Sequence, residues 1–326
     1  MDERQQAKLF VYLGFLLFIL CVCALAACKT GEMGSKIFPV IPGATYVGDQ
    51  ACLDCHEDSH PGLMASYKGS IHGALADFET LGRKKGCESC HGLGSVHAES
   101  GSPADILNLK KIGPEAAAEI CLECHKTGGP MKWRGGEHAM NDVSCVDCHQ
   151  MHKTRSATAS KEINAPTSAW ERHAVRSPSL KKAEPDLCYD CHENIQVRFN
   201  YPSHHPVREG KMICSDCHEP HGGPGNLKTE GMAAQDVCFN CHARYQGPFA
   251  YEHEAVIEGC GNCHEPHGAV VDNLLKKTEP FLCLQCHRVH SPIQAVGNLT
   301  QTVGNRCSYC HPEVHGSNVT PHLGLK

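Results

Sequence analysis

The sequence is poor in the residues that normally build a protein core. Only 6% of its 326 residues are aromatic, and Leu, Ile, Val and Phe make up about 17% of residues 28–326. Folded domains usually contain at least roughly 20% of these four residues. This scarcity excludes an ordinary globule packed from side chains. Because short segments throughout the chain carry paired cysteines, we expect a non-protein group to supply the missing core.

The sequence also lacks an excess of positive charge. Its formal net charge is −6 at neutral pH. Nucleic-acid binding depends on clustered Lys and Arg that neutralise phosphates. We therefore expect no nucleic-acid partner.

Long hydrophobic runs are absent except at the N-terminus, where residues 9–27 carry no charge and follow Arg4 and Lys8. Residues 25–28 (LAAC) resemble a bacterial lipobox, so residues 1–27 are predicted to be a lipoprotein signal peptide. Cys28 would then be lipidated and would anchor the chain to the bilayer. The alternative is an uncleaved N-terminal helix, since Asp2 and Glu3 are unusual in a leader. Both interpretations export the rest of the chain.

Cysteine, by contrast, is abundant, and 20 of the 23 cysteines lie in ten copies of Cys-x-x-Cys-His. Two cysteines at this spacing can form thioethers with one haem while the adjoining histidine ligates its iron. Cys28 and the leader residues Cys21 and Cys23 account for the rest, so no thiol remains for disulfides. The motifs are Cys52/Cys55/His56, Cys87/Cys90/His91, Cys121/Cys124/His125, Cys145/Cys148/His149, Cys188/Cys191/His192, Cys214/Cys217/His218, Cys238/Cys241/His242, Cys260/Cys263/His264, Cys283/Cys286/His287 and Cys307/Cys310/His311.

Zinc sites and redox dithiols are the alternative uses of paired cysteines. Neither explains a histidine at the same offset in all ten copies. The sequence therefore predicts ten covalently bound c-type haems, whose apolar porphyrins replace the missing side-chain core.

Fourteen histidines remain after the ten proximal ligands, enough for a second histidine on every iron. Residues 138–152, 205–221 and 253–267 share a repeat in which one histidine precedes a motif and another follows it by three residues. A histidine so close to a proximal ligand starts on the same side of the ring, so we expect it to ligate a neighbouring haem. The predicted distal ligands are His72, His97, His138, His152, His205, His221, His253, His267, His290 and His315.

Several other side chains remain alternatives to this set. His60 and His204 are the nearest rivals of His72 and His205, whereas His173 and His322 are expected to make surface or propionate contacts. Methionine would raise the potential of a haem, but gap filling is the expected role of the methionines because patterned histidines suffice. They are Met64, Met131, Met140, Met151, Met212 and Met232.

The motif positions divide the chain. After the leader, we expect a lipid-anchored linker (28–46), an N-terminal multihaem segment with motifs 1–4 (47–152), a loop or linker insertion (153–187), and a C-terminal multihaem segment with motifs 5–10 (188–326). Short helices are predicted at 114–120 and 233–237. The expected fold is a multihaem cytochrome c of loops and short α-helices around a linear chain of ten haems, with little or no β-sheet.

The motif order and the local sequences KGSIHG (68–73), CSDCHEPHG (214–222) and VHGSN (314–318) resemble the MtrA-type (DmsE-like) decahaem cytochromes over residues 46–318. The resemblance implies an extended rod that enters an outer-membrane β-barrel of MtrB type from the periplasm. It also implies an extracellular multihaem cytochrome as a partner and a periplasmic or inner-membrane cytochrome as the donor. The same ten distal histidines are implied.

The expected function is electron transfer by hopping between haems across the outer membrane, in an electron-transfer protein rather than an enzyme. One alternative is a lipid-anchored shuttle or filament cytochrome that works without a barrel. A multihaem reductase is the less favoured alternative, because it needs an open coordination position on iron and the sequence offers a histidine for each one.

Overall fold

The computed structural model describes residues 39–75, 79–80, 83–84, 86–152, 179–228, 233–288 and 306–323. Cys28, His173, Met232 and His290 lie outside the described residues. The elements are α2 (Asp49–Ser59), α3 (Pro61–Lys68), α4 (Ile71–Ala74), β1 (Glu79–Thr80), β2 (Arg83–Lys84), α5 (Glu88–His91), α6 (Ser95–Ser100), α7 (Pro114–Leu122), η1 (Gly129–Gly135), α8 (Glu137–Met140), α9 (Cys145–Cys148), α12 (Asp186–Tyr189), α13 (Glu193–Arg198), α14 (Cys214–Cys217), η2 (Pro224–Asn226), α15 (Asp236–Phe239), η3 (Ala243–Tyr245), α16 (Glu254–Glu258), η4 (Cys260–Asn262), η5 (Asp272–Leu274), η6 (Cys283–Gln285) and η8 (Cys307–Tyr309).

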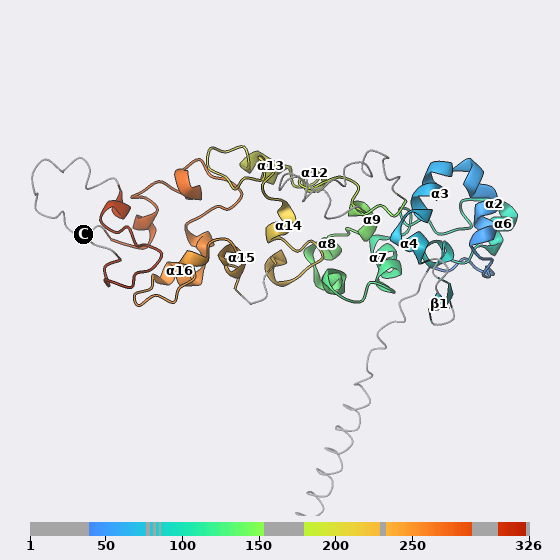
Figure 1. The fold of residues 1–326 in the computed structure, drawn as a ribbon, viewed down its shortest axis with the longest axis horizontal. Helices are drawn as coiled ribbons and strands as arrows, with labels where there is room; N and C mark the ends of the chain where they lie inside the picture. The colour runs from blue at the N-terminus through green and yellow to red at the C-terminus, as the bar shows by residue number, and fades with distance from the viewer. Residues whose placement is uncertain are drawn as a thin grey trace, which may run out of the picture.

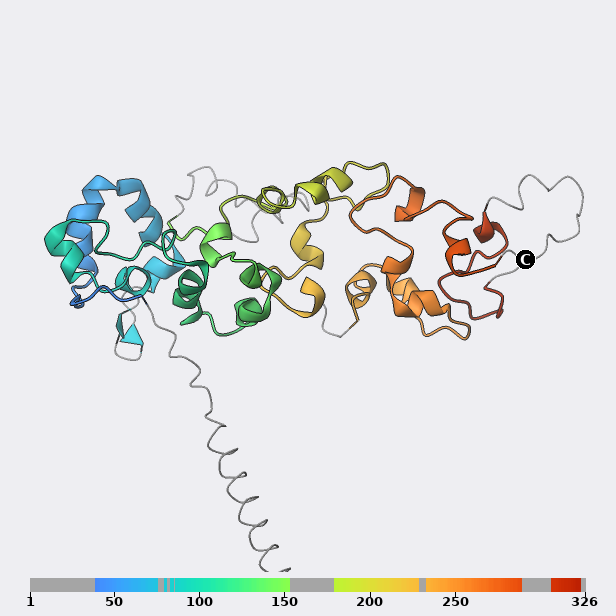
Figure 2. The same ribbon diagram turned by 180° about the vertical axis from the view of Figure 1, so that it is seen from behind.

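From the N-terminal helices to the C-terminal turns, these elements are arranged along the long axis of the molecule broadly in sequence order, with α6 lying back beside α2 (Figures 1 and 2). Helices α2, α3 and α6 lie at one end, α9 and α14 lie near the middle, and the segment after α16 lies at the other end. The sheet of the described part is one antiparallel pair, β1 with β2, of two residues each. The predicted fold of short helices and loops with little sheet is confirmed for this part.

Each described motif folds as one helical turn. The amide of the proximal histidine donates to the carbonyl of the first cysteine, for example from His91 to Cys87 (3.0 Å) and from His218 to Cys214 (2.9 Å). Residues three apart on a helical turn share a face. The turn therefore presents both cysteines to the same side.

The chain returns on itself in the same way after motifs 4, 6 and 8. Isolated antiparallel bridges join His149 to Leu180, His218 to Leu227 and His264 to Leu275. After motif 4, Gln150 donates to the carbonyl of Ser179 (2.7 Å), which places Ser179 beside motif 4. The described end of the predicted insertion, including Leu180, thus contacts motif 4. The assignment of 153–187 as a linker stays a prediction.

The side-chain core is small. Its main cluster consists of Ala118, Leu122 and Trp133. Helix α7 confirms the predicted helix at 114–120, with Pro114 in its first turn. The second predicted helix is displaced: α15 begins at Asp236 rather than residue 233, because the helical turn forms around the cysteine motif that follows. Within the described ranges, no helix has the length and hydrophobicity needed to cross a bilayer.

Candidate functional site

The first cysteines of successive motifs lie side by side in pairs. The two thiols of each pair lie close enough to shift each other's pKa, and in the pair Cys188 and Cys214 the interaction with Cys214, followed by burial, raises the pKa of the Cys188 thiol. The pairs are Cys52/Cys87, Cys121/Cys145, Cys188/Cys214, Cys238/Cys260 and Cys283/Cys307.

The second cysteine of motifs 2, 4, 6 and 8 lies near a cysteine of the next motif, where the first cysteines form no pair. Burial raises the pKa of Cys90, and the charge of Cys124 adds to this shift. Burial also raises the pKa of Cys148, Cys217 and Cys263, and smaller contributions come from Cys188 and Cys191, from Cys241 and from Cys286, respectively. First and second cysteines therefore alternate along the chain in bringing motif to motif, from motif 1 to motif 10.

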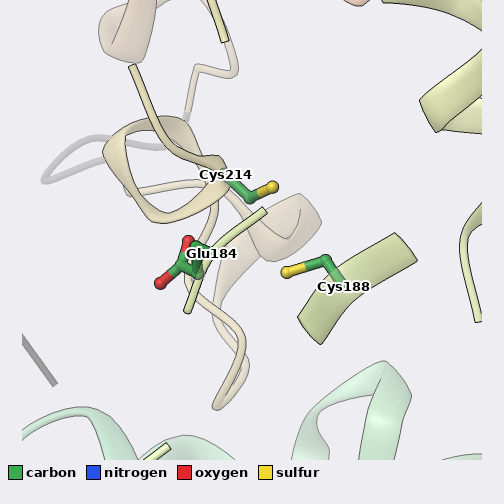
Figure 3. A group of neighbouring side chains, drawn as sticks. All are labelled: Glu184, Cys188 and Cys214. Atoms are coloured by element: carbon green, nitrogen blue, oxygen red, sulfur yellow. The ribbon is translucent and has the colours of Figure 1, made fainter. Parts of the chain in front are cut away.

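Two of these cysteine pairs, each with a nearby glutamate, also resemble a binding site for a single metal ion. A carboxylate oxygen of Glu184 and the Sγ atoms of Cys188 and Cys214 all lie within 4.8 Å of one another (Figure 3). Glu279, Cys283 and Cys307 form a similar group. Glu184 accepts a hydrogen bond from the Ser215 amide (2.8 Å), so its carboxylate is already held by the backbone. A zinc ion here would have three ligands and would leave the adjoining histidine unused, contrary to the usual four-ligand structural site.

The proximal histidines face distal histidines across a gap. Nine of the ten proximal rings each lie opposite one predicted distal ring, with ring centroids 5.9–6.2 Å apart. The pairs are His56/His97, His91/His152, His125/His72, His149/His221, His192/His138, His218/His267, His242/His205, His264/His315 and His287/His253. The tenth proximal ligand, His311, has its predicted partner His290 outside the described part of the chain.

This spacing fits an iron between the two rings. Two metal–nitrogen bonds of about 2.0 Å each, together with the two ring radii, give a centroid separation of about 6 Å. None of the nine pairs joins a proximal histidine to the histidine that follows it by three residues. His221, for example, follows His218 in sequence but faces His149.

In many of these rings a hydrogen bond holds the nitrogen that points away from the gap. Nδ1 of His91 donates to the carbonyl of Leu107 (2.9 Å), and Nδ1 of His264 donates to that of Asn273 (2.8 Å). Among distal residues, His138 donates to the Pro220 carbonyl (2.9 Å). Such bonds fix the tautomer and leave Nε2 as the ligand.

Burial keeps several of these rings neutral. It lowers the pKa of His72, His149 and His315, and the histidine facing each one (His125, His221 and His264, respectively) lowers it further. Neutral imidazole is the form that binds iron. The charge state therefore suits ligation as well as the distance does.

The cysteine and histidine side chains line one long cavity. Its volume is 5230 Å³, and its lining extends from Val47 to Leu323. A pocket for one small ligand usually occupies about 300–1,000 Å³. Divided among ten motifs, the cavity provides about 520 Å³ each, within that range. These residues thus fit a row of haems.

The nearest alternative histidines point elsewhere. His204 uses Nδ1 on the Tyr201 carbonyl (2.6 Å) and Nε2 on Glu209 (3.1 Å), and these two bonds, that to Glu209 first, raise its pKa. His60 lies beside its neighbour His56 on the Nδ1 side of that ring (3.4 Å), rather than across the gap. The backbone carbonyl of His322 accepts from His311 Nδ1 (2.9 Å).

The methionines leave the histidine pairs intact. Met131 and Met140 are exposed. Met64, Met151 and Met212 line the cavity. Nine proximal histidines already face another histidine, so no methionine is needed opposite these rings.

A glycine follows four of the predicted distal histidines, and after three of them, His221, His267 and His315, another segment passes close to it. A Cβ at Gly268 would lie 2.0 Å from the Arg198 carbonyl oxygen, and one at Gly316 would lie 2.2 Å from Phe249. Gly222 is similarly close to Lys132. All three have positive φ angles, which favour glycine. The His-Gly sequences therefore reflect crossing of segments at the distal ligands.

Comparison with known proteins identifies the family. A family described as a doubled CXXCH motif matches residues 204–247 and 253–292. The chain is 33% identical over 284 residues to the multihaem cytochrome MtrA of Shewanella baltica, covering 83% of this chain and 79% of that protein. The chain belongs to the MtrA-type multihaem c-type cytochromes. The resemblance predicted from the motifs is confirmed.

This MtrA-type chain also has more distant relatives. It is 23% identical to the C-type polyhaem cytochrome OmcB of Geobacter sulfurreducens, with 71% of this chain matching 33% of OmcB. It is 25% identical to the cytochrome c-type protein TorY of Haemophilus influenzae, with 43% of this chain matching 40% of TorY. Both names agree with covalently bound haem as the cofactor and electron transfer as the general function of the family.

Sequence reasoning did not identify the groups that orient the distal ligands. Carbonyls of Pro220, Pro266 and Val314 accept from His138, His205 and His253, at 2.9, 2.7 and 3.0 Å. These acceptors lie 61–82 residues from their histidines in sequence. The only feature of the sequence that could have indicated these acceptors is that each accepting residue directly precedes another distal histidine.

Replacing a distal ligand is expected to open one iron. In the reduced wild-type protein, carbon monoxide should not bind, because we expect a histidine at both axial positions of each iron. His205→Ala removes the ring opposite His242 and is expected to admit one carbon monoxide per chain. The Soret band of the reduced protein reports this binding.

The adjacent residue provides the matched control. His204→Ala should leave carbon monoxide binding undetectable, since both ring nitrogens of His204 already contact groups outside the gap. Binding to His204→Ala but not to His205→Ala would reverse the assignment of the distal ligand.

Proposed function

We propose that this protein carries electrons along ten haems between the periplasm and the cell exterior, as the conducting element inside an outer-membrane β-barrel. The observation that carries the proposal is the succession of ten motifs, each next to the following one, in which nine of the ten proximal histidines face a predicted distal histidine. When bound, the haems supply one-electron carriers close enough to exchange electrons with their neighbours. Either direction of flow is compatible with this arrangement.

The chain's own residues supply ligation and spacing. We propose that the ten proximal histidines and the ten predicted distal histidines are the iron ligands, including His290 for the iron of His311. The alternating cysteine contacts support close approach of successive haems, because each thioether pair fixes one edge of a porphyrin. No described pair leaves an axial position for a substrate, which favours electron transfer over a reductase.

A distal ligand taken from another motif also ties the chain together. The iron of His149 would be held by His221, and that of His218 by His267. Each haem thereby links segments that are far apart in sequence. This cross-linking supports a fixed distance between haems in a chain with a small side-chain core.

A barrel suits the exposed surface of such a chain. Irregular backbone cannot face lipid, because its unpaired amides and carbonyls would be costly to bury there. Enclosure within a barrel of MtrB type would let loops and short helices cross the bilayer. We also propose a periplasmic or inner-membrane cytochrome as the donor, an extracellular multihaem cytochrome as a partner, and lipidation of Cys28 at the outer membrane.

Co-purification tests the conduit. Membranes from cells producing the tagged chain are solubilised in mild detergent, and captured proteins are identified and quantified by mass spectrometry. We expect a large β-barrel protein at an equal molar amount, with ten haems bound to the chain. Cys28→Ser is the companion variant. It should still co-purify with the barrel, but its mass should lack the contribution of the lipid.

The alternative is a lipid-anchored shuttle or filament. It is favoured if the haem-loaded chain is captured alone while other barrels survive the same detergent. Cytochrome fibres in electron micrographs would then distinguish the filament from the shuttle.

A further inference from the structure

Three tripeptides occupy the same place after motifs 4, 6 and 8. They begin directly after the proximal histidine and end at a distal histidine: Gln150-Met151-His152, Glu219-Pro220-His221 and Glu265-Pro266-His267. Their first residues differ in charge, since two are carboxylates and one is a neutral amide. All three form the same backbone contact, donating their amide across the returning strand to Ser179, Asn226 and Leu274.

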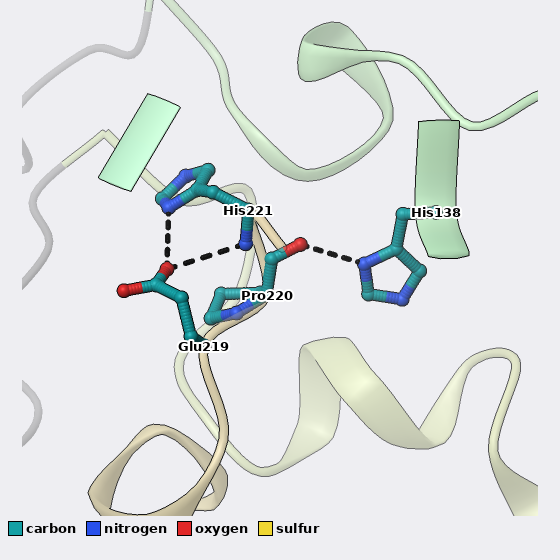
Figure 4. A network of polar contacts seen from close by, with 4 residues as sticks. All are labelled: His138, Glu219, Pro220 and His221. Carbon is teal, nitrogen blue, oxygen red and sulfur yellow. Dashed lines mark hydrogen bonds and ion pairs between the residues drawn. The ribbon is translucent and has the colours of Figure 1, made fainter. Parts of the chain in front are cut away.

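The two carboxylates contact the distal rings directly. Oε1 of Glu219 accepts from Nδ1 of His221 (2.9 Å, Figure 4), and Oε1 of Glu265 accepts from Nδ1 of His267 (3.3 Å). Gln150 instead donates its amide to the backbone carbonyl of His152 (3.5 Å).

Other distal histidines donate to neutral acceptors. His97, His138, His205 and His253 each donate to a backbone carbonyl. Figure 4 shows both kinds of bond at one tripeptide, where the Pro220 carbonyl accepts from His138 beside the Glu219–His221 pair. The tripeptide thus orients the distal ligands of two different irons but places negative charge beside only one.

A carboxylate acceptor makes an imidazole a more electron-rich ligand. It draws the Nδ1 proton towards itself and so raises the basicity of Nε2, which stabilises the more positive, oxidised iron. Partial burial strengthens the effect, because the side chains of Glu219 and Glu265 are 18% and 26% exposed. Arg198 pairs with Glu265 (2.6 Å) and offsets part of its charge. Among the described residues, no Lys or Arg forms an ion pair with Glu219.

We propose that Glu219 and Glu265 are tuning residues that lower the reduction potentials of the irons held by His149/His221 and His218/His267. The effect is larger at Glu219. The iron held by His91/His152, with Gln150 in the corresponding place, keeps a higher potential. This inference rests on the proposed ligation of haem by these histidine pairs.

Ring orientation separates these irons from those with strongly crossed ligands, in a group that also includes His264/His315 (15°) and His56/His97 (20°). The ring planes of His149/His221 and His218/His267 differ by only 7° and 8°, whereas those of His125/His72 differ by 67°. Nearly parallel imidazoles give oxidised low-spin haems a rhombic electron paramagnetic resonance spectrum, unlike strongly crossed ones. A potentiometric titration followed by this resonance therefore reports on the nearly parallel group, and the component that shifts in each variant identifies the tuned iron.

Glu219→Gln removes the charge and keeps an acceptor of the same shape. We expect one component of the rhombic signal to become easier to reduce, with roughly a tenfold change in its reduced-to-oxidised ratio at a given potential, or about 59 mV for one electron. Glu265→Gln should shift another component in the same direction by less. Gln150→Glu should lower the potential of the iron held by His91/His152.

Glu209→Gln is the matched control, because Glu209 contacts the non-ligating His204 and should shift no component. Unchanged potentials in Glu219→Gln and Gln150→Glu, with all haems still low-spin, would overturn the tuning role alone. If the wild-type protein lacked low-spin haem signals, the proposed bis-histidine ligation itself would be contradicted.

Discussion

Produced without haem attachment, the chain is expected to be largely unfolded. The described part buries few large side chains, and its main hydrophobic cluster holds only Ala118, Leu122 and Trp133. The 5230 Å³ cavity would expose apolar walls to water in the absence of porphyrins. Far-ultraviolet circular dichroism and limited proteolysis of residues 28–326 made in a host that lacks the attachment machinery measure this outcome.

The control is the same chain exported with the attachment machinery present, which should resist protease. Helix α7 is expected to be the most persistent element in the haem-free chain, because it contributes Ala118 and Leu122 to the hydrophobic cluster. A protease-resistant, cooperatively melting haem-free chain would contradict the conclusion that haem supplies the core.

Removing a central haem is expected to interrupt electron transfer. The triple variant Cys188→Ala, Cys191→Ala and His192→Ala lacks the fifth attachment motif. This motif lies between motifs 4 and 6, because its Cys188 is near both Cys148 and Cys214. Tunnelling decays exponentially with distance, so the rate across the gap should fall by orders of magnitude. The measurement is reduction of a dye inside liposomes that carry the chain with its barrel, after an external reductant is added.

Two further variants separate conduction from folding. His138→Met retains the fifth haem through its thioethers but raises its potential, so it should slow transfer without abolishing it. His204→Ala should transfer at the wild-type rate. A triple variant that carries one haem fewer and still transfers at the wild-type rate would contradict a single linear path.

Much of the chemistry was predictable because it is local. The spacing within each motif defines two cysteines and a histidine on one turn, and spacing alone identified the His-motif-His repeat around motifs 4, 6 and 8. The helix at Pro114–Leu122 was also predictable, since proline at its start and a run of good helix formers act locally. The start of α15 was misplaced because the motif turn, rather than the preceding residues, fixes that helix.

The partner of each distal histidine could not be predicted in the same way. His221 lies three residues from His218 but faces His149, 72 positions earlier in the chain. Such pairs depend on how returning loops cross, and crossing is set by contacts such as that between Gly268 and the Arg198 carbonyl. The choice of His205 over His204 likewise depends on which ring reaches the Pro266 carbonyl.

By itself, the sequence determined the attachment motifs, the supply of histidines and the family, because these depend on residue types at short spacings. Only the tertiary structure decided which rings face each other, which nitrogen each ring keeps free, and which distal ligands contact a carboxylate. Those features arise where segments far apart in sequence meet, and short-range patterns carry no information about such meetings.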